Sequence, residues 1–234
     1  PEGKMRDDPN SVMIFAAGFG TRMGALTKDR PKPLIEVGGE TLIDRALSLV
    51  EAFGPDKIVV NLHYKADMLR QHLKCRDVVL IEEVPDILDT GGGLKAALPY
   101  LGANPVFTMN SDAVWVGPNP LDYLVKSWAP EKMDALLLCV PISSTHGHSS
   151  SGDFLLDEEG RLTRGPGEVF SGLQIIKTES VAKQKARSFS LNEVWTQAEQ
   201  DGRLFGRSYP GAWCDVGNPS GIALAEDILG LDHA

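Results

Sequence analysis

Hydrophobic residues along the chain alternate between short continuous runs and helix-like spacings, and this alternation predicts most of the secondary structure. The run VMIFAA at 12–17 is short, wholly apolar and ended by glycine, which is typical of a buried strand. Apolar positions within 41–53 recur at helical spacing, and Gly54-Pro55 supplies a stop signal. By the same criteria we predict strands at 57–62, 78–81, 105–110 and 135–140, and helices at 66–73, 94–101 and 121–128.

Strands and helices alternate at short spacing as far as residue 140, and this order predicts an α/β fold. Such connections favour a mostly parallel central sheet with helices on both faces. In sheets of this kind ligands bind outside the carboxyl ends of the strands. The segments AAGFGTRM and NSD both follow predicted strands, so we expect them to lie close together although they are far apart in the sequence.

After residue 140 the pattern changes. A polar loop, SSTHGHSSSG, comes first, and paired short strands are expected at 154–156 and 161–163 around DEEG. Further strands are predicted at 169–176 and 204–208, and helices at 190–200 and 219–229. We expect a flexible polar segment at 1–10 and a single domain at 11–234.

Composition and charge exclude several classes of protein. The chain has 234 residues, of which 42% are hydrophobic, and no apolar run approaches the roughly 18 residues of a membrane span. Its formal net charge of −9 argues against binding to a nucleic-acid backbone, which needs a basic face. Three widely spaced cysteines predict neither a disulfide framework nor a zinc site. We therefore expect a cytoplasmic protein with no nucleic-acid or membrane partner.

The glycine loop after the first predicted strand suits phosphate groups but matches neither of two common nucleotide loops. It lacks the Gly-Lys-Ser/Thr of a P-loop. Gly18 and Gly20 fit the dinucleotide fingerprint, yet Met23 stands at its third glycine position. Arg22, and Lys32 between two prolines, add cations that bind phosphate well. A tight turn would explain the glycines alone, but the combination favours a ligand with several phosphates.

The motif AAGFGTRMGALTKDRPKPL resembles the signature of the sugar-1-phosphate nucleotidylyltransferases, which make nucleotide-activated sugars. The resemblance continues through PLIEVGGETLIDRAL, LDTGGGLKAAL, NSDAVW and WCDVGNP. Within this family the chain is similar to N-acetylmuramate-1-phosphate uridylyltransferases and mannose-1-phosphate guanylyltransferase-like proteins. The resemblance implies a Rossmann-like nucleotidyltransferase fold, with a nucleotide-binding half at 11–140 and a sugar-binding half at 141–234 that contains a small antiparallel portion.

The reaction that the resemblance implies is transfer of a nucleoside monophosphate from an NTP to a sugar 1-phosphate, with release of pyrophosphate. A sugar phosphate is mostly dianionic at neutral pH, so the attack needs positioning and charge neutralisation more than a protein nucleophile. Arg22 is expected to grip the triphosphate, and Lys32 to bridge the nucleotide α-phosphate and the sugar phosphate. Asp112 and Asp215 are the implied ligands of Mg²⁺, although each alone could be a turn or cap residue.

The resemblance also implies which residues surround the two substrates. The nucleotide site is expected to include Ala16, Ala17, Gly18, Gly20, Thr21, Thr90, Gly91, Gly92 and Asn110, with backbone groups at 90–92 against the base. The sugar site is expected to include Gly152, Asp153, Glu168, Ser171 and Gly172. Larger relatives carry Glu-Lys-Pro and then Asn-x-Gly in this region. This chain instead places Arg164 near the lysine position and Phe170 at the asparagine position, which leaves the sugar open.

Several functions stay open at this point. We favour UTP with N-acetylmuramate 1-phosphate, and the alternative is GTP with mannose 1-phosphate. A non-catalytic regulatory subunit would be expected to lose the motif lysine or the metal aspartates, which this chain keeps. A nicotinamide oxidoreductase is disfavoured because the second predicted strand ends without an acidic residue.

Two histidines in the Ser-rich loop, His146 and His148, lack the further ligands of a zinc site, and we expect that loop over the sugar phosphate. The expected partners are small-molecule substrates, in a monomer or small homo-oligomer.

Overall fold

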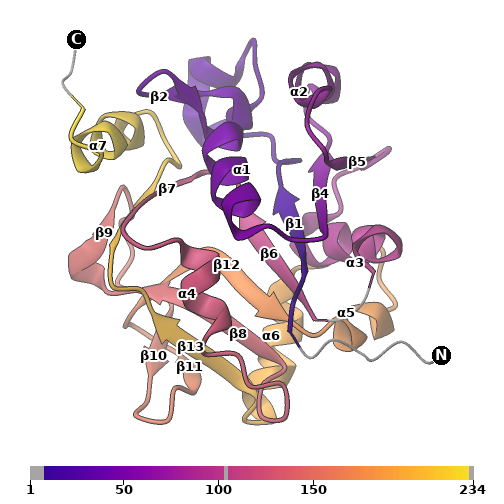
Figure 1. Ribbon diagram of the computed structural model, residues 1–234, viewed down its shortest axis with the longest axis vertical. Helices are drawn as coiled ribbons and strands as arrows, with labels where there is room; N and C mark the ends of the chain where they lie inside the picture. The colour runs from indigo at the N-terminus through magenta and orange to yellow at the C-terminus, as the bar shows by residue number, and fades with distance from the viewer. Residues whose placement is uncertain (1–7, 103–104, 232–234) are drawn as a thin grey trace.

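A seven-stranded sheet forms the centre of the computed structural model, which describes residues 8–102 and 105–231 (Figure 1). The strand order is β13-β8-β12-β6-β1-β4-β5. These strands are β1 (Ser11–Phe15), β4 (Lys57–Leu62), β5 (Val79–Glu82), β6 (Val106–Asn110), β8 (Ala135–Val140), β12 (Val169–Ile176) and β13 (Leu204–Ser208). All neighbours pair in parallel except β12, which is antiparallel to both β6 and β8. The expectation of a mostly parallel sheet is confirmed.

Helices cover both faces of the sheet, because successive strand side chains point to opposite sides. In β1, Val12 and Ile14 belong to one hydrophobic core and Met13 to the other. The first core lies beneath α1 (Leu42–Phe53), α2 (Ala66–Leu73) and α4 (Pro120–Val125). The second lies beneath α3 (Asp89–Leu101), α5 (Glu179–Lys183) and α6 (Leu191–Gln200) (Figure 1). This layering leaves the strand ends free to form a site.

The two halves of the chain contribute strands to the same central sheet. The strands β12 and β13 come from 141–234, yet they lie in the central sheet on either side of β8. A smaller sheet joins β7 (Ala113–Val116), β14 (Ala212–Asp215) and β9 (Thr145–His146), and the hydrophobic pattern missed all three. Its strands are short and their pairing is non-local, so no local periodicity reports them. The predicted antiparallel pair is present as β10 (Phe154–Leu156) and β11 (Leu162–Arg164).

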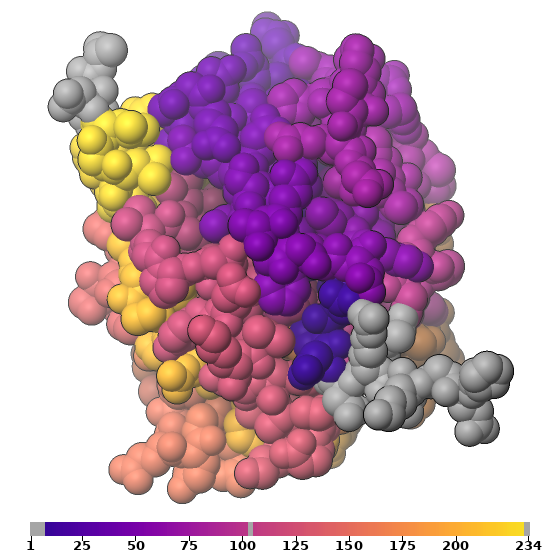
Figure 2. Space-filling model, in the orientation of Figure 1, coloured from indigo at the N-terminus to yellow at the C-terminus, as the bar shows by residue number. Residues whose placement is uncertain are grey.

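The C-terminal helix α7 (Ser220–Ile228) lies against the segment of β2 (Glu36–Val37) and β3 (Glu40–Thr41), as Figures 1 and 2 show. A third hydrophobic cluster joins these parts, and it includes Val37, Cys214 and Ala225. Gly38 N–H also donates to the carboxylate of Glu226 at 3.0 Å. The cluster also contains Val216, so it fixes the chain on both sides of Asp215, a predicted metal ligand at the end of β14.

The bounds of two predicted segments can be compared with the structure. Helix α3 begins at Asp89, not at residue 94, because its three glycines are helical. Of the predicted flexible segment 1–10, residues 1–7 lie outside the described residues, whereas Asn10 is tied down by its carbonyl, which accepts the Asp56 N–H at 2.9 Å. Within the described ranges, no helix has both the length and the apolar character that crossing a membrane requires.

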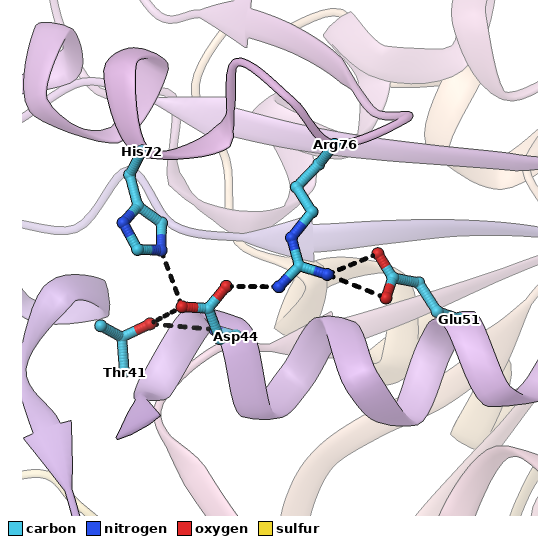
Figure 3. Close-up of polar contacts among 5 residues, drawn as sticks. All are labelled: Thr41, Asp44, Glu51, His72 and Arg76. Atoms are coloured by element: carbon cyan, nitrogen blue, oxygen red, sulfur yellow. Dashed lines mark hydrogen bonds and ion pairs between the residues drawn. The ribbon is translucent and has the colours of Figure 1, made fainter. Parts of the chain in front are cut away.

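A polar network joins α1 to the end of α2 (Figure 3). The carboxylate of Asp44 accepts hydrogen bonds from Thr41 Oγ1 at 2.6 Å and Arg76 Nη2 at 2.8 Å, and it lies 2.7 Å from His72 Nε2. Arg76 also reaches Glu51. Burial alone would raise the pKa of Asp44, but these hydrogen bonds outweigh it and lower that pKa.

Candidate active site

A cavity of about 310 Å³ opens at the carboxyl ends of β1 and β6. The structure thus brings together the two segments that the sequence placed at strand ends. Ten predicted residues line this cavity: Ala16, Ala17, Gly18, Gly20, Thr21, Arg22, Lys32, Thr90, Asn110 and Asp112. The glycine loop continues into the 3₁₀ helix η1 (Thr21–Thr27), which directs Arg22 to this cavity.

Lys32 and Asp112 form an ion pair in the cavity. Lys32 Nζ donates to Asp112 Oδ2 at 2.7 Å, and the lysine side chain is only 11% exposed. Gly20 makes this position possible, because it is left-handed (φ 64°) and a Cβ there would lie 2.8 Å from Lys32 Cβ. Pro31 and Pro33 flank the lysine at the start of η2 (Lys32–Leu34). The prolines therefore restrain the backbone of Lys32, and the ion pair with Asp112 holds its ammonium group.

Asp215 lies at the end of β14, next to the same cavity. Its neighbour Val216 donates its backbone N–H to the carbonyl of Asp112 at 2.9 Å, which holds the two aspartate backbones together. A methyl group on Gly217 would lie 2.8 Å from Asp215 Oδ2 and 3.1 Å from Arg22 Nη1. The carboxylate and the guanidinium therefore flank one small space, which only glycine leaves open.

The electrostatics of Asp215 suit a bound cation. Burial raises the pKa of Asp215, and the charge of Asp112 raises it further, while Lys32, Arg22 and His148 oppose the shift. A divalent cation held by Asp112 and Asp215 would oppose this rise in pKa. No group of three or more His, Cys, Asp or Glu residues that could hold a metal occurs in the described part of the chain. Two carboxylates of this kind could hold Mg²⁺, which prefers oxygen ligands and usually completes its shell with substrate oxygens and water.

A buried polar wall on the far side of the cavity was missed by the sequence analysis. Asn61 Oδ1 accepts the Ala16 N–H at 2.7 Å, and Asn61 Nδ2 donates to Glu83 Oε1 at 2.8 Å. Glu83 is 2% exposed, and its Oε2 accepts the Leu88 N–H at 2.7 Å. Asn61 and Glu83 both line the cavity. Two features of the sequence could have indicated this wall: Asn61 is a polar residue inside the apolar run KIVVNL, and Glu83 is an acidic residue just after β5.

The three glycines that open α3 serve packing. A Cβ on Gly91 would meet the Phe189 ring, and one on Gly92 would meet the carbonyl oxygen of Arg187. A Cβ on Gly93 would lie 2.7 Å from Glu83 Oε1. The N–H groups of Gly91 and Gly92 donate to Phe189 O at 2.9 and 3.1 Å, and neither residue lines the cavity. Contact of Gly91 and Gly92 with a base stays a prediction. Of the predicted segment 90–92, only Thr90 is among the residues that line the cavity.

A second cavity of about 360 Å³ adjoins the first, and both are lined by Phe15, Asp89, Thr90 and Asn110. Among the predicted sugar residues, Asp153 and Gly172 line it. Asp153 Oδ2 accepts the Phe170 N–H at 2.8 Å. Gly172 (φ 88°) lies so close to Asn110 that a Cβ would be 2.8 Å from that side chain.

The other three predicted sugar residues lie elsewhere. Gly152 packs on the backbone of Gly167, and Ser171 is buried with its Oγ donating to Leu138 O at 2.6 Å. Glu168 accepts a hydrogen bond from Ser208 Oγ at 2.8 Å. The register of β12 against β8 shifts between Phe170 and Gln174, a local irregularity of this segment. These residues were expected from the family resemblance, which does not report how the segment packs in this chain. We leave these three residues out of the sugar site proposed below.

The Ser-rich loop lies near Asp215. A Cβ on Gly147 would meet the carbonyl oxygen of Asp215. His148 Nε2 is 2.5 Å from Ser150 Oγ, and its ring centroid is 6.2 Å from that of Trp213. His146 belongs to β9. Contact of either histidine with substrate stays a prediction.

The phosphate loop, the fixed lysine and the paired carboxylates at the strand ends define a nucleotide-dependent transferase of the Rossmann-like α/β class. The chain belongs to the family of MobA-like NTP transferase domains, whose model matches residues 12–150. It is a nucleotidyltransferase, and the family resemblance seen in the sequence is confirmed.

Relatives of known activity match nearly the whole chain. It is 37% identical to the N-acetylmuramate alpha-1-phosphate uridylyltransferase of Caulobacter vibrioides, over 96% of this chain and 99% of the relative. It is 31% identical to the corresponding Neisseria meningitidis protein, over 94% and 98% of the two chains. HddC from Yersinia pseudotuberculosis, crystallised with GMP-PN, shares the fold with a TM-score of 0.77 and 23% identity, over 94% of this chain and 99% of HddC.

Proposed function

We propose that the protein transfers the uridylyl group of UTP to N-acetylmuramate 1-phosphate. A phosphate oxygen of the sugar 1-phosphate attacks the α-phosphorus of UTP. The bond from that phosphorus to the oxygen bridging the β-phosphate breaks, and pyrophosphate leaves with the electron pair. The observation that carries the proposal is Lys32, fixed at Asp112 in the first of two adjoining cavities.

Each charged residue has one role in this reaction. Lys32 binds the α-phosphate and the incoming sugar phosphate and so aligns the attack. Arg22 binds the β- and γ-phosphates and balances the charge of the leaving pyrophosphate. Asp112 and Asp215 would hold Mg²⁺, which when bound neutralises phosphate charge. No protein proton transfer is required, since the attacking phosphate is mostly ionised at neutral pH.

The two cavities divide the substrates. The first, with the glycine loop and the wall of Asn61 and Glu83, accommodates the nucleotide. The second, with Asp153 and Gly172, accommodates the sugar. Asn110 lies on the boundary, since it lines both. The choice of uracil and N-acetylmuramate is supported by the two relatives above and not by a contact in the structure.

A coupled pyrophosphate-release assay tests the proposal. UTP and GTP are crossed with N-acetylmuramate 1-phosphate and mannose 1-phosphate, with Mg²⁺ and with EDTA. We expect the highest kcat/KM for UTP with N-acetylmuramate 1-phosphate and no turnover in EDTA. A preference for GTP with mannose 1-phosphate would overturn the substrate assignment. Nucleotide binding without pyrophosphate release from any pair would instead identify a regulatory subunit.

A further inference from the structure

We propose that Arg164, positioned by Asn192, binds a carboxylate on the sugar 1-phosphate and thereby selects sugars that carry a second anionic group. The inference rests on the proposed function and deepens it by naming the group that distinguishes the sugar. Arg164 is the last residue of β11, and Asn192 lies in the first turn of α6. Both line the second cavity.

The guanidinium group of Arg164 is held in place while keeping donors free. Its Nη2 donates to Asn192 Oδ1 at 2.9 Å, and its central carbon lies 5.2 Å from the Phe154 ring centroid and 6.0 Å from that of Trp195. Within the described ranges, Arg164 forms no ion pair with a carboxylate, and its Nε and Nη1 make no hydrogen bond. The same Nη2 also lies 3.5 Å from Asn192 O. With Nη2 directed at Asn192, the N–H donors of Nε and Nη1 stay available for charge-assisted hydrogen bonds to a carboxylate.

The charge of the second cavity supports this assignment. Among its described lining residues Arg164 is the one cation, whereas Asp89 and Asp153 are acidic. Both acids have other partners: Asp89 Oδ1 accepts the Thr90 N–H at 2.6 Å, and Asp153 Oδ2 accepts the Phe170 N–H at 2.8 Å. Without Arg164 the acidic side chains of the cavity would repel an anionic substituent of the sugar. Arg164 is therefore the counter-ion available to a carboxylate that enters the cavity.

The position of Arg164 also suits a sugar whose phosphate lies near Lys32. The cavities meet at Asn110, so a sugar ring extending from the phosphate site enters the second cavity. Trp195 forms one wall, and its Nε1 donates to Gln174 Oε1 at 2.8 Å, which fixes the indole. Phe170 packs edge-on against it with ring centroids 4.9 Å apart. These rings form an apolar wall for the sugar body and leave Arg164 for its charged substituent.

The test compares two sugars that differ in this group. N-acetylmuramate 1-phosphate carries a lactyl carboxylate that N-acetylglucosamine 1-phosphate lacks. We expect Arg164→Gln to lower kcat/KM for N-acetylmuramate 1-phosphate by roughly 10- to 100-fold, mainly through KM, the usual range for a lost charge-assisted pair. The value for N-acetylglucosamine 1-phosphate should stay within about two-fold. Asn192→Ala should give a smaller loss in the same direction, because it releases the fork but keeps the charge.

Arg161→Gln is the matched control, because Arg161 lies on the same hairpin and its ion pairs are with Asp157 and Glu159 outside the cavity. It should change neither substrate's kcat/KM, and all variants should keep the wild-type melting temperature. Equal losses of Arg164→Gln on both sugars, with an active wild type, would overturn the carboxylate assignment alone. A wild type that does not use N-acetylmuramate 1-phosphate would overturn the proposed function as well.

Discussion

Lys32 Nζ lies 2.7 Å from Asp112 Oδ2, which joins the residue proposed to bind phosphate to one proposed to hold a metal. Each neutralises the other in the absence of substrates. On the proposed roles, a phosphate that enters the cavity would draw the Lys32 ammonium group away from Asp112, and the carboxylate would then need another cation. If Lys32 binds phosphate and Asp112 holds a metal ion as proposed, the pair would couple substrate binding to metal binding through charge.

Asp112→Asn should separate these two roles. Without the carboxylate, Lys32 is free for phosphate, so metal-free binding of UTP should be unchanged or a few-fold tighter. Turnover with Mg²⁺ should fall by at least about 100-fold, the scale for loss of a charge-stabilising group at a reaction centre. Isothermal titration in EDTA measures the first effect and pyrophosphate release the second. Full turnover in this variant would remove Asp112 from the proposed metal site.

Lys32→Ala should lower kcat/KM by about 10²- to 10⁴-fold while the protein keeps its fold, because the ammonium group both aligns and neutralises the reacting phosphates. Steady-state kinetics and a melting curve check the two halves of this statement. Lys28→Ala is the matched control: Lys28 is exposed, directly follows η1 as its C-cap and does not line the cavity. A variant at Lys32 with near wild-type kinetics would contradict the proposed mechanism.

Gly92→Ala should destabilise the protein by about 1–3 kcal/mol, because the added methyl meets the backbone carbonyl of Arg187 in a closely packed contact. Urea denaturation gives the free energy of unfolding.

Gly18→Ala is the contrast to Gly92→Ala, since a Cβ there has nothing within 4 Å. It should leave stability unchanged but weaken nucleotide binding by roughly ten-fold or more, because the space belongs to the cavity. Equal stability of both variants would show that the glycines of α3 are not required for packing.

Asp44→Asn should lower the free energy of unfolding by about 1–3 kcal/mol at neutral pH, the worth of hydrogen bonds to a charged group. Folding lowers the pKa of Asp44, so this contribution is complete above its ordinary value of 3.8. It is lost as the pH falls through the lower pKa of the folded state. Denaturation at pH 7 and in acid should therefore show wild type and variant converging at low pH.

Asp67→Asn is the control, because the Asp67 side chain is 98% exposed in its pair with Arg70. It should have little effect on stability at either pH. A constant difference between wild type and Asp44→Asn across the whole pH range would contradict the linkage.

Most elements could be predicted from the sequence where the pattern is local. The bounds predicted for α2, β4, β8, β12 and β13 agree with the structure, because each has a clear apolar periodicity. The sheet of β7, β14 and β9 was not predicted, since its strands pair across long stretches of chain. Thr90, and not Gly91 or Gly92, lines the first cavity, because tertiary packing takes up the glycines.

The sequence by itself determined where the glycine loop, the lysine between two prolines and the polar residues after strands occur. Strand ends and turn residues can be recognised from short stretches of sequence. Only the tertiary structure decided which distant groups meet. It brought Asp215 beside Arg22 through β14, buried Glu83 against Asn61, and placed Arg164 in the second cavity. These contacts depend on the order of the strands in the sheet and on the packing of α3 and α6. The hydrophobic periodicity of a single segment reports neither of them.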